Sequence, residues 1–151
     1  MIVKKVSDQD TWAIRGEILR PGKPLSTCQF EEDQLAEAVH FTSVDANRQT
    51  GVVSAYPIPF PQQNALTDCW QLRAMATIVA VRGQGHGAAL VGALEDYLHT
   101  RSARWLWCNA RQEAIGFYVK CGFELRGDEF DIAGIGPHRT MLKSLDDKAL
   151  R

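Results

Sequence analysis

The chain has 151 residues, of which 45% are hydrophobic and 23% are charged, and its formal net charge is −1. This length fits one domain over residues 1–151, with a core that buries roughly two-thirds of the unfolded surface. The near balance of charge disfavours a nucleic-acid-binding module, which needs a basic stripe. The lack of a long apolar run disfavours a membrane-spanning protein.

The predicted elements alternate between strands and helices in the middle of the chain and form hairpins toward its ends. The first half contains a strand over Met1 to Val6, a helix over Gln9 to Leu19, and at most one or two helical turns within Phe30 to Glu37. Three strands follow, over Val39 to Val44, Val52 to Ile58 and Trp70 to Thr77. The second half contains a helix over Gly85 to Thr100, a strand over Arg104 to Asn109, a helix over Gln112 to Lys120, and strands over Phe123 to Asp131 and His138 to Leu145.

Three of these elements carry specific expectations. The turn-rich segment Asp45 to Gly51 predicts the loop of a hairpin. The helix over Gly85 to Thr100 has apolar residues at helical spacing, with Glu95 expected on its polar side. The helix over Gln112 to Lys120 is expected to stop at Cys121-Gly122. Together the elements predict an α/β (α+β) fold around one mixed, mostly antiparallel sheet.

The four cysteines predict neither a metal site nor a redox motif. They are Cys28, Cys69, Cys108 and Cys121, and none has CxxC spacing or a zinc-ligand pattern with histidine. We expect reduced structural thiols, with Cys108 buried in its apolar strand. The N-terminus lacks the apolar core of a signal peptide. The sequence therefore predicts a cytoplasmic protein that binds no metal, nucleic acid or membrane.

The most informative segment is the glycine-rich turn Val81 to Leu90, between a strand and an amphipathic helix. Glycines allow a sharp turn, and the unpaired N–H groups at the start of a helix favour a phosphate or diphosphate. Arg82 adds a positive charge there. The competing interpretation is a tight structural turn.

Two other phosphate-binding motifs fit this segment less well. Gly83, Gly85 and Ala88 satisfy G-x-G-x-x-A, but a dinucleotide site needs an acidic residue at the end of the next strand, which here ends in Asn109. A P-loop needs a lysine and a serine or threonine after the glycines, and the chain has none there.

The segment resembles the central motif R-x-x-G-x-G/A of the GNAT superfamily of N-acetyltransferases, which matches Arg82 to Gly87. Leu72 to Thr77 is similar to the fourth strand of that family, and Asn109 to Tyr118 and Cys121 to Glu124 are similar to later signatures. Val79 stands where many relatives have proline, a difference that concerns loop stiffness. The resemblance is strong over the C-terminal half and implies six to seven strands flanked by about four helices.

The resemblance also implies roles for individual residues. The diphosphate of CoA would bind backbone N–H groups of Arg82, Gly83, Gln84, Gly85, His86 and Gly87. The pantetheine arm would pair with the strand at Met75, Ala76 and Thr77, beside a bulge, and an N–H near Met75 or Ala76 would stabilise the oxyanion. Asn109 would hydrogen-bond the cofactor arm, with a helix N-cap as its alternative role. Tyr118 would protonate the departing thiolate, or else be a packed aromatic residue.

The general base is open. His138 is a candidate because histidine titrates in a useful range, although a hydrogen-bonded structural histidine is the competing role. His40 is a weaker candidate, and the side chain of His86 is expected to be solvated. The acidic run Glu31 to Asp33 is expected to form a solvated face, although it could attract a cationic amine.

The resemblance implies an N-acetyltransferase that transfers the acetyl group of acetyl-CoA to a primary amine by direct attack, through a tetrahedral intermediate. The alternative is a catalytically silent acyl-CoA-binding sensor or scaffold. The acceptor stays open between a small molecule and a peptide, as does the use of other acyl groups. The oligomeric state is open too, and a homodimer is compatible with the sequence.

Overall fold

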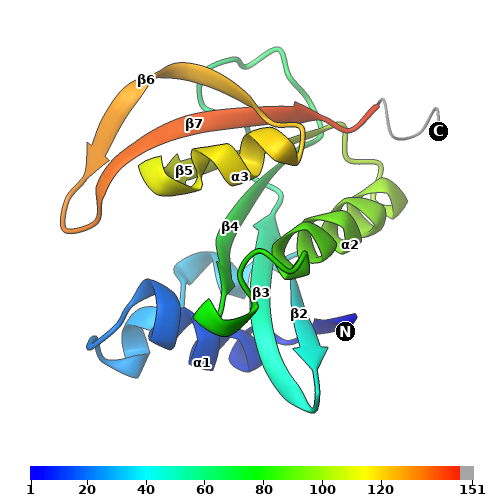
Figure 1. The fold of residues 1–151 in the computed structure, drawn as a ribbon. Helices are drawn as coiled ribbons and strands as arrows, with labels where there is room; N and C mark the ends of the chain where they lie inside the picture. Colours follow the sequence, from blue (N-terminus) through cyan, green and yellow to red (C-terminus); the bar gives the residue numbers. More distant parts are fainter. Residues whose placement is uncertain (147–151) are drawn as a thin grey trace. The chain divides into compact units, whose positions relative to one another are not determined.

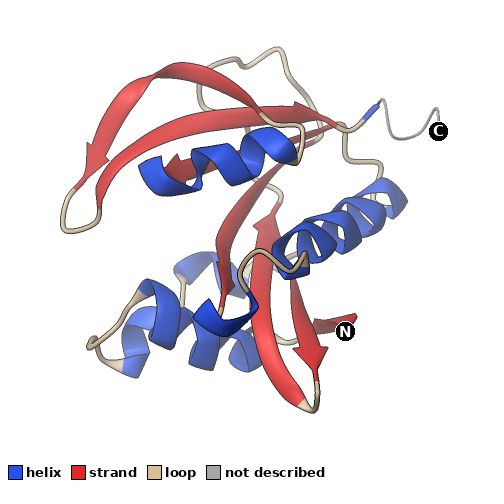
Figure 2. Ribbon diagram, viewed as in Figure 1, coloured by secondary structure: helices blue, strands red, loops and turns tan. Residues whose placement is uncertain are grey.

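The computed structural model describes residues 1–146, which divide into two compact units (Figure 1). Unit 1 comprises Met1–Pro57 and Leu72–Leu98, and unit 2 comprises Ile58–Gln71 and the residues from His99 onward. The described strands form one seven-stranded sheet of order β1-β2-β3-β4-β5-β7-β6, and strand β4, Cys69–Thr77, contributes residues to both units. Helices and one mixed sheet therefore make up the fold (Figure 2), which confirms the predicted fold class.

Strands β1, β2 and β3 of unit 1 are antiparallel neighbours. They cover Ile2–Val6, Val39–Asp45 and Arg48–Tyr56. The hairpin between β2 and β3 turns at Ala46 and Asn47, whose φ angles of 50° and 62° fit a two-residue type I′ turn. The loop predicted over Asp45 to Gly51 is therefore too long. Strand β3 already begins at Arg48. The side chains of Gln49 and Thr50 are hydrogen-bonded to Thr42 and Ser43 of β2.

The helical region after β1 is less regular than predicted. A 3₁₀ turn over Asp8–Thr11 leads into α1, Trp12–Ile14, and then into a wider π turn over Arg15–Leu19. The wider turn closes where the Arg20 N–H donates to the Arg15 carbonyl at 3.0 Å. Two further 3₁₀ turns, Leu25–Cys28 and Glu31–Gln34, follow. The second matches the expected short helical stretch, and the first was not predicted.

Helix α2, His86–Thr100, packs its leucines into the core of unit 1. Leu90, Leu94 and Leu98 are fully buried. Glu95 is buried as well, so its expected place on the polar side is wrong. The reason is its spacing, because residue 95 lies one turn from Val91 and from Leu98 and so belongs to the buried stripe.

Unit 2 contains β5, Trp105–Arg111, with Cys69–Gln71 of β4 parallel to it on one side and β7, Gly136–Ser144, antiparallel on the other. Strand β6, Glu124–Ile132, pairs with β7 at the edge of the sheet. The buried run Leu106, Trp107 and Cys108 confirms the prediction that this strand is covered on both faces.

Helix α3, Ile115–Lys120, follows a 3₁₀ turn over Gln112–Ala114 and stops at Cys121-Gly122 as predicted. Residues 1–146 thus contain three α-helices and several short 3₁₀ or π segments, where about four helices were expected. In this part of the chain no helix has the length and apolar character needed to cross a membrane.

Candidate functional site

The glycine loop follows β4 and leads directly into α2, as the sequence predicted. A 3₁₀ turn over Val79–Val81 precedes it, and Gly83 and Gly85 have φ angles of 79° and 88°. These left-handed angles explain why glycine occupies both positions. A Cβ built at either residue meets no atom within 4 Å, so the backbone faces open space.

The N–H groups of this loop divide into two sets. The Arg82 N–H donates to the Val79 carbonyl at 3.2 Å, and the Gln84 N–H donates to the Val81 carbonyl at 3.1 Å. These two groups would have to change partners to bind a phosphate. The other predicted donors are Gly83 within the loop and Gly85, His86 and Gly87 at the head of α2, where a helix has no internal acceptors for its first N–H groups.

Arg82 and His86 are the two basic residues of the loop, and their side chains differ in exposure. Arg82 is exposed, and its guanidinium donates to the Thr77 carbonyl at 3.4 Å. His86 is only 4% exposed, so the expectation of a solvated side chain is wrong. Its Nδ1 is hydrogen-bonded to Thr50 Oγ1 at 2.8 Å, and its Nε2 lies 4.0 Å from an Asp45 carboxylate oxygen. The histidine therefore points into the fold and away from a ligand on the loop.

Strand β4 is interrupted just before Met75. Ala74 has a φ of 54°, which is a left-handed conformation inside a strand. Such a residue breaks the alternation of side chains and is a feature of β-bulges. As a result Arg73, Ala74 and Met75 are all half-buried, whereas Ala76 returns to the core.

Asn109 and Tyr118 lie in unit 2. Asn109 is exposed on β5, and its Oδ1 accepts a hydrogen bond from Thr140 Oγ1 at 2.9 Å. The side-chain NH₂ group is then the part available to a ligand. Asn109 is not a helix N-cap, since Arg111 occupies the cap position before the 3₁₀ turn that precedes α3.

Tyr118 is buried on α3, with ring centroids of Phe117 and Phe123 at 5.2 and 5.4 Å. Burial raises the pKa of Tyr118 well above its ordinary value. The phenol therefore keeps its proton throughout the neutral range. The same surroundings also provide the aromatic packing that was the competing role for this residue.

His138 lies on β7, opposite Arg111 on β5 and Phe130 on β6. Its side chain is buried, its Nδ1 donates to the Gly136 carbonyl at 2.8 Å, and its ring stacks on Phe130 at 6.0 Å. In the neutral ring this bond leaves Nε2 as a proton acceptor. The contacts fit the structural role, and the role of general base stays a prediction.

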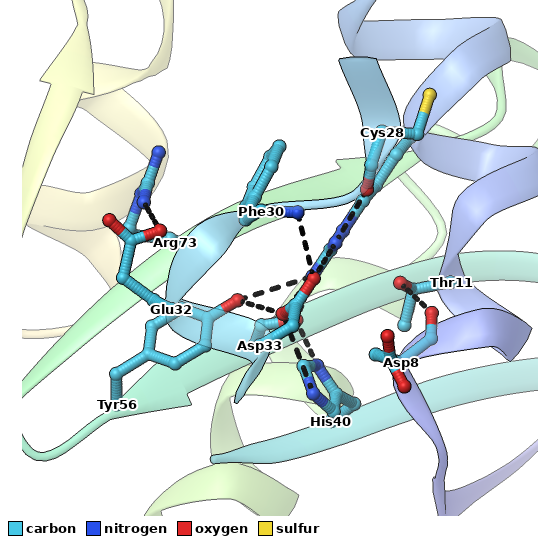
Figure 3. A network of polar contacts seen from close by, with 11 residues as sticks. Asp8, Thr11, Cys28, Phe30, Glu32, Asp33, His40, Tyr56 and Arg73 are labelled. Atoms are coloured by element: carbon cyan, nitrogen blue, oxygen red, sulfur yellow. Dashed lines mark hydrogen bonds and ion pairs between the residues drawn. The ribbon is translucent and has the colours of Figure 1, made fainter. Parts of the chain in front are cut away.

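A buried polar cluster in unit 1 was not anticipated from the sequence (Figure 3). It consists of Arg15, Asp33, His40, Ser54 and Tyr56, and we call it the Arg15 cluster. Arg15 donates to both carboxylate oxygens of Asp33 at 2.8 and 3.2 Å, and also to Ser54 Oγ at 2.9 Å. Tyr56 donates to Asp33 at 2.6 Å, and His40 Nδ1 is hydrogen-bonded to Ser54 Oγ at 2.6 Å.

The Arg15 cluster corrects the expected solvated face of Glu31 to Asp33. The Asp33 side chain is only 1% exposed, and Glu32 forms an ion pair with Arg73 at 2.7 Å. Burial alone would raise the pKa of Asp33, but the hydrogen bonds from Arg15 and Tyr56 and the Arg15 charge lower it overall. Burial lowers the pKa of His40 and outweighs the attraction of Asp33. At neutral pH the cluster therefore holds a charged Arg15–Asp33 pair and a neutral histidine.

The predicted site residues are divided between the two units. Met75–Thr77 and Arg82–Gly87 belong to unit 1, and Asn109, Tyr118 and His138 belong to unit 2. Among residues 1–146, no group of three or more His, Cys, Asp or Glu side chains is arranged to hold a metal ion. Cys28, Cys69 and Cys108 are buried free thiols.

Comparisons with known proteins identify the family of the chain. The sequence model described as "Acetyltransferase (GNAT) family" matches residues 9–123. The uncharacterized N-acetyltransferase YitI of Bacillus subtilis is 35% identical over 145 residues, which cover 95% of each chain.

Solved structures show the same fold at lower identity. An aminoglycoside 6′-N-acetyltransferase complexed with coenzyme A has a TM-score of 0.73 and 16% identity, with 96% of this chain and 97% of that chain covered. A chimera of spermidine N-acetyltransferase SpeG from Vibrio cholerae and hSSAT has a TM-score of 0.73 and 17% identity over the whole of both chains. The family model matches residues 9–123, and the Bacillus subtilis relative is 35% identical over 145 residues. The chain therefore belongs to the GNAT family of acetyltransferases.

Proposed function

We propose that the chain is an N-acetyltransferase that moves the acetyl group of acetyl-CoA to a primary amine. The observation that carries the proposal is the open glycine loop, where Gly83 and Gly85 turn the backbone into the head of a fifteen-residue helix. Family membership supports acetyl transfer, and the solved relative bound to coenzyme A supports the donor.

Donor binding would use backbone groups more than side chains. The N–H groups of Gly83, Gly85, His86 and Gly87 would hold the diphosphate, because the helix head carries partial positive charge. The backbone of Met75–Thr77 would pair with the pantetheine arm. The NH₂ group of Asn109 would donate to a carbonyl of the same arm.

The reaction would be a direct attack on the thioester. The amine loses a proton and its nitrogen attacks the carbonyl carbon, which gives a tetrahedral intermediate with charge on oxygen. A backbone N–H near Met75 or Ala76 would stabilise that oxygen. The carbon–sulfur bond then breaks as the carbonyl re-forms, and the sulfur takes a proton from Tyr118. The nitrogen gives up its second proton, which restores the phenol of Tyr118, so the products are an amide, the free thiol of CoA and the first proton on the base. No nucleophilic side chain is needed.

The group that accepts the amine proton is either His138 through Nε2 or a water molecule. His138 supports the first option because its Nδ1 bond to Gly136 keeps Nε2 as the acceptor. Replacing His138 by Gln keeps a hydrogen-bonding side chain but removes the ring nitrogen that would accept the proton. A shift of the pH–rate profile in the variant would assign the base to His138, and an unchanged profile would assign it to water.

The acceptor is the least specified part of the proposal. Similar structures are named for acetylation of an aminoglycoside and of spermidine, so amines of quite different size are candidates. A free-thiol release assay with acetyl-CoA fixed and a panel of small amines and peptides tests the proposal directly. Release that depends on one class of amine supports it.

Tyr118→Phe separates an enzyme from a silent acyl-CoA-binding module. The variant keeps the buried ring but loses the proton, so we expect kcat to fall by roughly a hundredfold or more. The rise in Tm caused by acetyl-CoA should stay the same, because binding does not need the phenol. Tyr97→Phe on α2 is the matched control. An unchanged kcat in Tyr118→Phe would remove this residue from the mechanism.

A further inference from the structure

We propose that Thr50 is a positioning residue that fixes both ends of the glycine loop and so sets the affinity for the diphosphate of the donor. This inference rests on the proposed function. It assigns a role to a residue on β3 that lies outside every motif in the sequence.

Thr50 forms one hydrogen bond on each side of the loop, one through its backbone and one through its side chain. Its carbonyl accepts the N–H of Ile78, the residue before the 3₁₀ turn that leads into the loop, at 2.9 Å. Its hydroxyl is hydrogen-bonded to Nδ1 of His86, the first residue of α2, at 2.8 Å. Thr50 and His86 are both buried, so neither bond competes with solvent. One residue therefore holds the chain just before the 3₁₀ turn that leads into the loop and again where the loop enters α2.

The surroundings hold Thr50 in place. Its hydroxyl also lies 2.8 Å from Ser43 Oγ on β2, and Ser43 is fully buried. The next residue, Gly51, is in close contact with α2 and β4. A Cβ there would come within 2.8 Å of the Leu90 side chain and 3.0 Å of the Ala76 carbonyl. The strand cannot move away from the loop without disturbing the core of unit 1.

The loop needs such an anchor because Gly83 and Gly85 have great conformational freedom. Backbone N–H groups bind an anion well only when they already point at one place, since ordering them on binding costs affinity. His86 has the one buried side chain between Arg82 and Gly87. We infer that its imidazole contributes by holding the helix head against Thr50 and not by contacting the phosphate.

Thr50→Val tests the inference, because it removes the hydroxyl and keeps the branched shape and the backbone carbonyl. The donors to compare are acetyl-CoA and S-acetylpantetheine, which has the thioester but lacks the diphosphate. We expect Kd and KM for acetyl-CoA to rise roughly tenfold, with kcat at saturation nearly unchanged. kcat/KM for S-acetylpantetheine should stay as in the wild type, and Thr50→Ser should restore the acetyl-CoA values.

Thr42→Val is the matched control. Thr42 is a buried threonine of the same hairpin, and its hydroxyl donates to the Gly51 carbonyl without contacting the loop. It should cost similar stability without discriminating between the two donors. Should Thr50→Val fail to fold, Ser43→Ala removes the partner of the Thr50 hydroxyl and gives the same comparison with a smaller effect.

The outcomes separate this inference from the proposed function. A wild-type protein that binds no acetyl-CoA would overturn the proposed function itself. Wild-type binding together with an unchanged Kd in Thr50→Val would overturn the role of Thr50 alone. An equal loss with both donors would also overturn it, since the effect would then be general damage and not positioning for the diphosphate.

Discussion

Glu32 and Asp33 are neighbours in sequence, and each carboxylate forms an ion pair with an arginine. The two ion pairs differ strongly in their exposure to water. The Glu32 and Arg73 side chains are 34% and 31% exposed, whereas Asp33 and Arg15 are 1% and 0% exposed. Pairs that are partly open to water contribute little, because water and salt screen them. A buried pair that loses one partner leaves an uncompensated charge in a medium of low polarity.

Asp33→Asn and Glu32→Gln should therefore differ strongly in stability. For Asp33→Asn we expect a loss of about 3 kcal/mol in the free energy of unfolding, because the Arg15 charge stays buried without a counter-charge. For Glu32→Gln the loss should stay below about 1 kcal/mol. Urea unfolding of both variants measures the difference, and equal losses would contradict the burial argument.

The sequence could not reveal the Arg15 cluster, because its members come from distant segments. Arg15 and Asp33 are 18 positions apart, and Asp33 and Tyr56 are 23 positions apart. The side chain of His86 was misjudged for the same reason. Its neighbours in the glycine motif are exposed, and its partner Thr50 lies 36 positions earlier. The residue types of one segment do not show which residues of a distant segment they will contact.

Among the elements, α3 shows how local residues end a helix. The Gly122 N–H donates to the Val119 carbonyl and the Phe123 N–H to the Tyr118 carbonyl, both at 3.0 Å, which is the Schellman pattern. Gly122 has a φ of 96°, and a Cβ there would lie 3.2 Å from the Lys143 side chain. This end was predictable, because Cys121-Gly122 is a local signal.

Two glycine-to-alanine changes in this element should have opposite effects. Gly122→Ala should destabilise the fold by about 1 kcal/mol or more, because alanine disfavours the left-handed conformation. Gly116→Ala lies within α3 with nothing near its Cβ position, so it should stabilise by about 0.5–1 kcal/mol. Thermal unfolding of the pair gives the two signs, and a loss in both variants would show that α3 tolerates no added side chain.

Other elements were predictable to different degrees. Helix α2 and strand β5 were found because many apolar residues recur in one clear pattern. The stretch from Gln9 to Leu19 was predicted as one regular helix, but it is divided between a 3₁₀ turn, a short α-helical segment and a π turn. The β2–β3 turn was overestimated because Gln49 and Thr50 resemble loop residues, although their partners are on β2.

At the scale of the whole molecule, the order of the elements was enough to predict the fold class. Hairpins at the ends of the chain and alternating strands and helices in the middle predicted a mixed sheet, and the seven strands have that arrangement. Individual roles in the donor site depended on the resemblance and stay predictions. Side-chain environments such as that of His40 follow from tertiary packing, which no local pattern contains.

The Arg15 cluster also predicts how global stability depends on pH. His40 has a pKa below its ordinary value of about 6.5 in the folded protein, because burial disfavours its charged form. The unfolded chain then binds more protons than the folded one as pH falls below about 6.5, so the free energy of unfolding must decrease. Asp33 acts in the same direction, but only below about pH 4, because its pKa is also lowered.

We therefore expect the urea midpoint of the wild type to fall as pH is lowered from 7.5 to 5. His40→Asn can keep a hydrogen bond with Ser54 but cannot take up a proton, so its midpoint should start lower and change less over this range. The difference between the two curves isolates His40 from the other histidines. A wild-type midpoint that rises toward pH 5, or two parallel curves, would mean that the buried imidazole does not control the acid limit of the fold.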